Sequence, residues 1–265
     1  MKRRQFLAAS LASSAFALAG EASAQPQSAT AAREFYQLRR YNLKSGPQLK
    51  LTESYFSGAL IPALTRMGCG PIGAFRLEYG EQTPAYYLLI PGPSAEALAN
   101  LDLTLAKDEA LLAAAAPFWN ATAADPAFQR VEISLFAAFT GWPRVTPPPA
   151  SATKGKRIFQ MRTYESPSNG EHVRKVEMFH AGEFEIFVKA GFHPVFFGDA
   201  LTGPRLPNLT YMLSMENLAA LDEHWNAFRN DPDWKKLSSN PRYAYDQIVT
   251  NISNLLLSPL DCSQI

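Results

Sequence analysis

The chain repeats one strand-like motif at a spacing of 123 residues, and this duplication limits the possible folds more than any other feature. The motif reads Gln-x-Arg-x-Tyr, and its two copies are Gln37, Arg39 and Tyr41, then Gln160, Arg162 and Tyr164. Four turn residues keep the same spacing: Gly68, Pro71, Gly80 and Pro84 align with Gly191, Pro194, Gly203 and Pro207. Solenoid units are about 20 to 50 residues long, so a repeat of this length is a whole domain. We therefore predict two similar domains in one chain.

A second match shows that the first copy is longer. Trp119-Asn120-Ala121 ahead of Asp125-Pro126 matches Trp225-Asn226-Ala227 ahead of Asp231-Pro232, at a spacing of 106 residues. The first copy therefore carries 17 extra residues between Leu98 and Trp119. Function is expected where the two copies meet or differ.

Each copy reads as strand, helix, strand, strand, helix, strand. In the first copy, residue patterning predicts strands over 35–43, 72–79, 85–91 and 130–138, with a helix over 46–67 that ends at Gly68. The second copy should hold strands over 194–199, 209–215 and 245–254, and a helix that ends at Gly191. Each Asp-Pro pair is typical of a helix N-cap followed by proline, so each should open a short helix. This βαββαβ order is the ferredoxin-like pattern.

The predicted fold class is α+β, with two ferredoxin-like repeats packed as an intramolecular version of the dimeric α/β barrel. An antiparallel sheet with helices on one face needs a partner for its other face, and the duplication supplies one. We place the first domain at residues 34–142 and the second at 157–258. Residues 143–156 contain Pro147-Pro148-Pro149 and should form a stiff, exposed linker.

Residues 1–24 read as an export signal. Arg3-Arg4 followed by Phe6-Leu7 is typical of the twin-arginine type, and Ala22-Ser23-Ala24 of a cleavage site, although an ordinary secretory leader is an alternative. We expect a periplasmic or secreted protein in which residues 25–33 are disordered.

Composition excludes two classes of partner. Removal of the signal takes away three basic residues and one acidic residue and leaves a nearly neutral chain, which argues against a nucleic-acid partner. No stretch after Leu18 has the roughly 18 consecutive apolar residues of a membrane span. Cys69 and Cys262 could pair in an oxidising compartment or remain free thiols.

The repeated motif also supplies the candidate binding residues. Strand alternation puts its Gln, Arg and Tyr on one face; if the apolar face packs on the helices, Arg39 and Arg162 lie between the two sheets. Two guanidinium groups there need an anionic ligand or carboxylate partners. The row therefore indicates either a lumen that binds an acidic or polar small molecule, or a network that fixes how the halves dock.

All four histidines, His172, His180, His193 and His224, belong to the second copy. His180 and His193, with Asp199 and Glu183 nearby in sequence, could hold a metal or haem or act as acid and base. No pair has the i, i+4 spacing of a helix-borne metal site, so no metal ligand is predicted and no cofactor is indicated. We expect an asymmetric ligand site on the second copy, and the candidate residues are Arg39, Tyr41, Arg162, Tyr164, His193 and Tyr211.

The two Gln-x-Arg-x-Tyr strands, the helix-ending glycines and the Trp-x5-Asp-Pro-x-aromatic segments, which end at Phe128 and Trp234, resemble the NIPSNAP family in its tandem bacterial form. The resemblance covers about residues 34–258 and implies the dimeric α/β barrel fold. Animal members of the family are associated with mitochondria and with vesicle or autophagy adaptors. Bacterial members have no agreed activity, and the same fold hosts cofactor-free monooxygenases and haem proteins.

The sequence thus predicts an exported barrel protein that binds a small ligand or a protein partner, with catalytic residues unknown. The alternative is an oxidoreductase of the cofactor-free monooxygenase or haem-handling type that uses the same barrel. Formation of a homodimer is left open.

Overall fold

The computed structural model describes residues 33–265. The predicted export signal, its arginine pair and residues 25–32 lie outside the described residues. Within residues 33–265, no helix combines the length and the apolar character needed to cross a membrane.

Eight antiparallel strands close into a barrel in the order β1-β3-β2-β8-β5-β7-β6-β4. Each repeat contributes four strands in the same spatial order, and the repeats join where β2 pairs with β8 and β4 pairs with β6. This architecture confirms the predicted fold class. The strands are β1 (Phe35–Asn42), β2 (Gly73–Tyr79), β3 (Ala85–Gly92), β4 (Arg130–Ala138), β5 (Ile158–Glu165), β6 (His193–Thr202), β7 (Asn208–Met215) and β8 (Asn251–Pro259).

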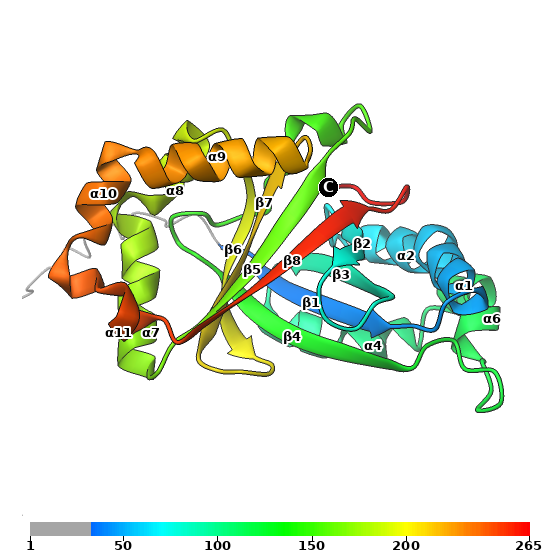
Figure 1. Ribbon diagram of the computed structural model, residues 1–265. Coiled ribbons are helices and arrows are strands. Elements are labelled where there is room, and N and C mark those ends of the chain that lie inside the picture. Colours follow the sequence, from blue (N-terminus) through cyan, green and yellow to red (C-terminus); the bar gives the residue numbers. More distant parts are fainter. Residues whose placement is uncertain (1–32) are drawn as a thin grey trace, which may run out of the picture. The chain divides into compact units, whose positions relative to one another are not determined.

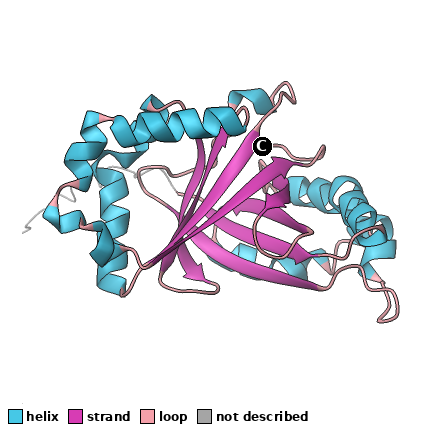
Figure 2. Ribbon diagram, viewed as in Figure 1, coloured by secondary structure: helices cyan, strands magenta, loops and turns pink. Residues whose placement is uncertain are grey.

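The helices cover the outside of the barrel, with each repeat's helices over its own strands (Figures 1 and 2). In both repeats the first long helix contains a π-helical turn, at Phe56–Leu60 (η1) and at Phe179–Glu183 (η3). These turns are again 123 residues apart, so the duplication extends to this local irregularity. The helices of the first repeat are α1 (Pro47–Tyr55), α2 (Ile61–Arg66), α3 (Ala95–Ala99), α4 (Leu101–Leu105), α5 (Glu109–Ala114) and α6 (Ala116–Trp119). Those of the second are α7 (Asn169–Met178), α8 (Phe184–Lys189), α9 (Leu218–Asn230), α10 (Pro232–Ser238) and α11 (Tyr245–Ile248), with short 3₁₀ turns at Pro149–Ser151 (η2) and Pro241–Tyr243 (η4).

Three hydrophobic cores stabilise this arrangement. One core lies under the helices of each repeat, and a third fills the barrel interior with side chains from both repeats. In the interior, Tyr36 of β1 meets Phe196 of β6 at 5.3 Å between ring centroids, and Phe75 of β2 meets Phe159 of β5 at 4.8 Å. The two repeats therefore share one apolar centre.

The orientation of the repeated polar row is the reverse of the prediction. Tyr36 packs inside the barrel, whereas Tyr41 packs under the helices against Phe56. The expectation that Arg39 and Arg162 face each other between the sheets is therefore wrong, because both lie between a half-sheet and its helices. An eight-stranded barrel has an interior just wide enough to be filled by side chains, and here apolar groups fill it.

Two expected elements also differ. No helix follows Asp125-Pro126, because β4 begins at Arg130 and leaves no room, whereas Asp231 caps α10 by accepting hydrogen bonds from the backbone N–H of Asp233 and of Trp234 (2.7 and 3.2 Å). The last strand begins at Asn251 instead of 245, since Tyr245–Ile248 forms a helical turn.

The Pro-rich linker is less exposed than predicted. Val145 is 8% exposed and packs with the barrel interior, and its N–H donates to the Glu34 carboxylate at 2.8 Å. The Thr146 N–H donates to the Val195 carbonyl at 2.8 Å. Backbone pairing thus fixes this end of the linker against the second repeat.

Candidate functional site

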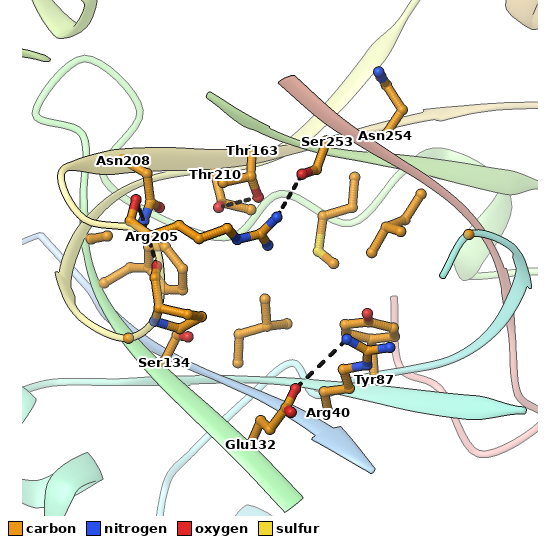
Figure 3. Close-up of a pocket in the computed structure, with 18 of the residues that line it drawn as sticks. Arg40, Tyr87, Glu132, Ser134, Thr163, Arg205, Asn208, Thr210, Ser253 and Asn254 are labelled. Atoms are coloured by element: carbon orange, nitrogen blue, oxygen red, sulfur yellow. Dashed lines mark hydrogen bonds and ion pairs between the residues drawn. The ribbon is translucent and has the colours of Figure 1, made fainter. Parts of the chain in front are cut away.

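Two cavities bear on the predicted ligand site. The first, about 460 Å³, opens into the barrel interior and takes its walls from both repeats (Figure 3). The second, about 380 Å³, lies between the second half-sheet and its helices, and we call it the second-repeat pocket. Its walls are Gln160, Arg162, Tyr164, Glu183, Trp225, Phe228, Arg229, Trp234, Tyr245 and Asn254.

The cations that line the interior cavity already have partners. Arg40 donates to the Glu81 carbonyl at 2.9 Å and lies 3.6 Å from the Glu132 carboxylate. Arg205 donates to the Ser253 hydroxyl at 2.7 Å, and Figure 3 shows its side chain reaching across the cavity to that strand. These contacts form a network that links loops and strands at the barrel mouth.

Arg162 is the distinctive group of the second-repeat pocket. Its guanidinium carbon lies 4.4 Å from the ring centroid of Trp225 and 5.3 Å from that of Tyr164, which is cation–π distance. Within residues 33–265, no carboxylate lies within ion-pair distance of Arg162, and its buried Nε has no hydrogen-bond partner. A largely buried charge without a counter-ion is costly, so this position favours an anion from outside the chain.

The equivalent arginine of the first repeat is neutralised internally. Arg39 lies 2.8 Å from the carboxylate of Asp102 in α4, and its Nε donates to the side-chain oxygen of Gln37. Asp102 belongs to the segment that contains the 17 residues absent from the second copy. The insertion therefore supplies a carboxylate to one arginine and leaves the other without one.

A hydrogen-bonded chain holds the aromatic wall of the pocket. The indole N–H of Trp225 in α9 donates to Gln160 at 2.8 Å, and the Gln160 amide donates to Asn254 at 3.2 Å. Because Gln160 and Asn254 stand on adjacent strands, the indole plane is fixed relative to the sheet that carries Arg162.

Tyr164 lines the pocket, and Tyr211 lies behind it. The hydroxyl groups of Tyr164 and Tyr211 are hydrogen-bonded at 2.9 Å, and both residues are buried. Burial raises the pKa of Tyr164 well above its usual value, and it raises the pKa of Tyr211 as well. Both therefore remain neutral at physiological pH.

A buried ion pair lies beside these groups. The Lys175 ammonium donates to Glu183 Oε2 at 2.7 Å, and neither side chain is more than 2% exposed. Burial lowers the pKa of Lys175, although the carboxylate of Glu183 opposes that shift. The ammonium also lies 4.3 Å from the ring centroid of Phe179. Arg162, Lys175 and Glu183 together give the inner site a net positive charge.

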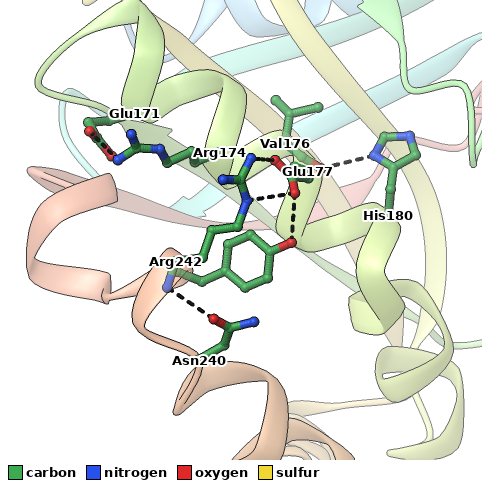
Figure 4. Close-up of polar contacts among 8 residues, drawn as sticks. Glu171, Arg174, Val176, Glu177, His180, Asn240 and Arg242 are labelled. Atoms are coloured by element: carbon green, nitrogen blue, oxygen red, sulfur yellow. Dashed lines mark hydrogen bonds and ion pairs between the residues drawn. The ribbon is translucent and has the colours of Figure 1, made fainter.

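An anchored loop closes one side of the pocket. Arg242 makes two hydrogen bonds to the Glu177 carboxylate on α7, at 2.8 and 2.6 Å, and the Tyr243 hydroxyl donates to the same group at 3.0 Å (Figure 4). This clamp holds the segment that carries Tyr245, which lines the pocket.

The structure brings together some of the predicted residues. Arg162 and Tyr164 line the pocket and Tyr211 lies beneath it, whereas Arg39 and Tyr41 lie under the helices of the first repeat. His193 is exposed at the start of β6, opposite Ser214, and is not among the pocket residues.

Sequence reasoning missed Tyr245, and it named Glu183 only as a group near His180 and His193 in sequence. Glu183 had a detectable signal, since it stands opposite the apolar Leu60 in the 123-residue alignment. Trp225 was visible in the repeated Trp-Asn-Ala motif, but nothing in that motif showed that its ring lies over Arg162.

The histidines take other contacts. His172 pairs with Asp199 at 2.7 Å, and His180 accepts from the Gly141 N–H at 3.1 Å while its Nδ1 donates to the Val176 carbonyl at 2.9 Å. None of the four lines the second-repeat pocket, so a haem ligated there by histidine does not fit the residues present. Over residues 33–265, no group of three or more His, Cys, Asp or Glu side chains is placed to hold a metal ion, and both cysteines are free.

Comparison with proteins of known structure supports the fold. A "putative monooxygenase" from Lactobacillus acidophilus superposes with a TM-score of 0.55 at 8% identity, over 86% of this chain and 94% of that one. A "putative monooxygenase" from Fusobacterium nucleatum gives a TM-score of 0.55 at 10% identity, over 87% and 94%. An anthrone oxidase-like protein gives 0.51 at 11% identity, over 87% and 93%. These likenesses establish a shared barrel fold.

At the level of sequence, no curated protein matches the chain. The NIPSNAP family model matches residues 159–264, which span β5 to β8 and all of the second-repeat pocket. The second repeat of this chain is a NIPSNAP domain.

Proposed function

We propose that the second-repeat pocket binds a small aromatic molecule that carries an acidic group. The observation that carries this proposal is Arg162, a largely buried guanidinium without a carboxylate partner among the described residues, in contrast to Arg39 with its partner Asp102. A carboxylate on the ligand would accept charge-assisted hydrogen bonds from Arg162 and replace the missing partner.

The walls of the pocket favour a flat ring. Trp225, Trp234 and Tyr245 supply aromatic surface around the arginine. Aromatic rings pair in stacked or edge-to-face arrangements that contribute about 0.5–1.5 kcal/mol beyond the burial of area. The chemistry of the site therefore matches an aromatic acid better than an aliphatic one.

The test uses 1-naphthoate as the probe, with binding measured by calorimetry and by quenching of tryptophan fluorescence. Arg162→Gln should weaken binding about 10- to 100-fold, because a hydrogen bond to a charged group contributes about 1.5–3 kcal/mol. Arg39→Gln is the matched control, since it changes the same motif residue outside the pocket, and it should alter affinity less than threefold. Equal losses in both variants, or no binding to the wild-type protein, would reject the proposal.

A second candidate is oxidation of an aromatic ketone or phenol by O₂ without a cofactor. It is favoured by Arg162 and the neutral Tyr164 in the pocket wall, because a cation and a polar hydroxyl beside one cavity stabilise an enolate or phenolate. The names of the fold relatives also support it. Anthrone is a suitable probe: anthrone and O₂ give anthraquinone and water. Oxygen uptake should be slower in Arg162→Gln than in Arg39→Gln, and a rate equal to that of buffer alone would exclude this reaction.

We also propose that the protein acts outside the cytoplasm. The support is the Arg3-Arg4 pair and the Ala22-Ser23-Ala24 cleavage site. Replacing both arginines with lysine should block export if the twin-arginine route is used. Undiminished periplasmic protein would point to the general secretory route.

A further inference from the structure

Glu183 presents an unused acceptor to the second-repeat pocket. The residue is 2% exposed and lines the cavity. Its Oε2 accepts from the Lys175 ammonium at 2.7 Å, whereas its Oε1 has no hydrogen-bond partner among residues 33–265. Because Oε1 is not among the buried atoms that lack a partner, it is an acceptor that a group in the cavity can reach.

The fold does not require this ion pair. The first repeat has a π-helical turn at the equivalent place, without the kink at Gly182, and Thr52 and Leu60 stand opposite Lys175 and Glu183. Buried ion pairs contribute little to stability compared with apolar residues of similar volume, because desolvation offsets the attraction between the charges. The pair at this position therefore calls for a role other than stability.

We propose that Glu183 accepts a hydrogen bond from a hydroxyl or amino group of the bound ligand, so that the ligand of this pocket is an aromatic acid with a second, donating substituent. This inference rests on the proposed function. Arg162 binds the acidic group and Glu183 selects the donor, and the two residues reach the pocket from β5 and from the π-helical turn.

Lys175 is a positioning residue in this arrangement. Its ammonium donates to Oε2 of Glu183 at 2.7 Å and leaves Oε1 for another donor. Its positive charge also offsets the repulsion that Glu183 would otherwise exert on an anionic ligand. The site thus accepts a negative group and a hydrogen-bond donor in the same ligand.

The test compares three kinds of probe on the intact protein: 1-naphthoate, its hydroxy derivatives with the hydroxyl away from the carboxylate, and their methyl ethers. At least one hydroxy derivative should bind about tenfold more tightly than 1-naphthoate, and its methyl ether should lose that gain, because it cannot donate. The variant Lys175→Thr with Glu183→Leu imports the residues of the first repeat, and in it the ratio of the two affinities should fall to about one. Circular dichroism checks that this variant is folded.

The comparison of probes on the wild-type protein does not depend on the variant. One outcome is that 1-naphthoate binds through Arg162 and every hydroxy derivative binds with the same affinity as 1-naphthoate. In that case the role of Glu183 is wrong and the proposed function stands. If the double variant keeps the tenfold preference, Glu183 is not the acceptor and the inference is likewise overturned. If no naphthoate binds, both proposals fail.

Discussion

Arg39 and Arg162 occupy equivalent positions in the two repeats but have different partners. Both guanidinium groups lie between a half-sheet and its helices, but only Arg39 has a carboxylate, from Asp102. A buried arginine that is paired inside the protein contributes to the folded state, whereas one without a partner holds charge that a ligand can use. The difference comes from an insertion elsewhere in the chain.

This contrast predicts unequal effects of the same substitution. Arg39→Met should lower the free energy of unfolding by about 1–3 kcal/mol, because it leaves the buried Gln37 side chain without its partner, whereas Asp102 is 56% exposed and stays hydrated. Arg162→Met should change it by less than about 1 kcal/mol without ligand, since the lost contact with Trp225 is offset by removal of an unpaired charge. Urea unfolding of both variants measures the difference, and a larger loss for Arg162→Met would contradict it.

Sequence reasoning reached part of this arrangement. Strand alternation correctly placed the Gln, Arg and Tyr of each motif on one face, because side chains alternate along any strand. It could not show which face of β1 points into the barrel. Both faces of β1 are largely buried, and the alternation between polar and apolar residues along the strand is incomplete. The choice depends on how much volume a closed barrel leaves inside, which is a property of eight strands together.

The repeated Asp-Pro signal shows the same limit at the level of elements. Asp231 caps a helix of seven residues, but the equivalent Asp125 is followed by strand β4 at Arg130. A cap residue stabilises a helix only where the chain has room to form one. Strand positions were easier to predict, because β1 and β3 carry their own turn and patterning signals.

The clamp on the segment 241–248 gives a prediction with a pH dependence. Hydrogen bonds from Arg242 are the main cause that holds the pKa of Glu177 below its usual 4.5, so the ionised carboxylate stabilises the folded state. Its contribution is fully present above about pH 4.5 and is lost as the pH falls through the lower pKa of the folded protein. Glu177→Gln should therefore be less stable than wild type at pH 7, and the difference should shrink in acid.

Urea unfolding of wild type and Glu177→Gln at neutral pH and at pH values below 4 measures this dependence. The exposed Asp233, which pairs with Lys189 at 3.1 Å and has a 70% exposed side chain, supplies the control variant Asp233→Asn. The control should change stability little at neutral pH, as most surface ion pairs do. A difference for Glu177→Gln that grows in acid would show that the clamp does not act through the ionised carboxylate.

At the scale of the whole molecule, the duplication builds within one chain what two separate ferredoxin-like subunits would build together. The repeat spacing was sufficient to predict the barrel, because each half-sheet has one face that only another sheet can cover. The second-repeat pocket was not predictable in the same way. The pocket depends on the absence of the inserted helical segment from the second repeat. The effect of that absence on Arg162 can be recognised only when the structure shows Asp102 beside Arg39.

The shared interior predicts that the two repeats unfold together. Phe196 of the second repeat is fully buried and packs edge-on against Tyr36 of the first. Phe196→Ala should lower the free energy of unfolding by about 3–5 kcal/mol, from lost burial and the cavity it leaves. Because the interior joins both halves, unfolding should remain one transition, and amide protection should fall in β1 and β3 as well as in β6 and β7.

Hydrogen exchange with mass spectrometry measures the protection of each strand. The control is Val173→Ala, at a residue that is 62% exposed, and its expected change in the free energy of unfolding is below about 0.5 kcal/mol. Loss of protection confined to the second repeat, or two separate unfolding transitions, would mean that the halves are stable independently and that the interior does not couple them.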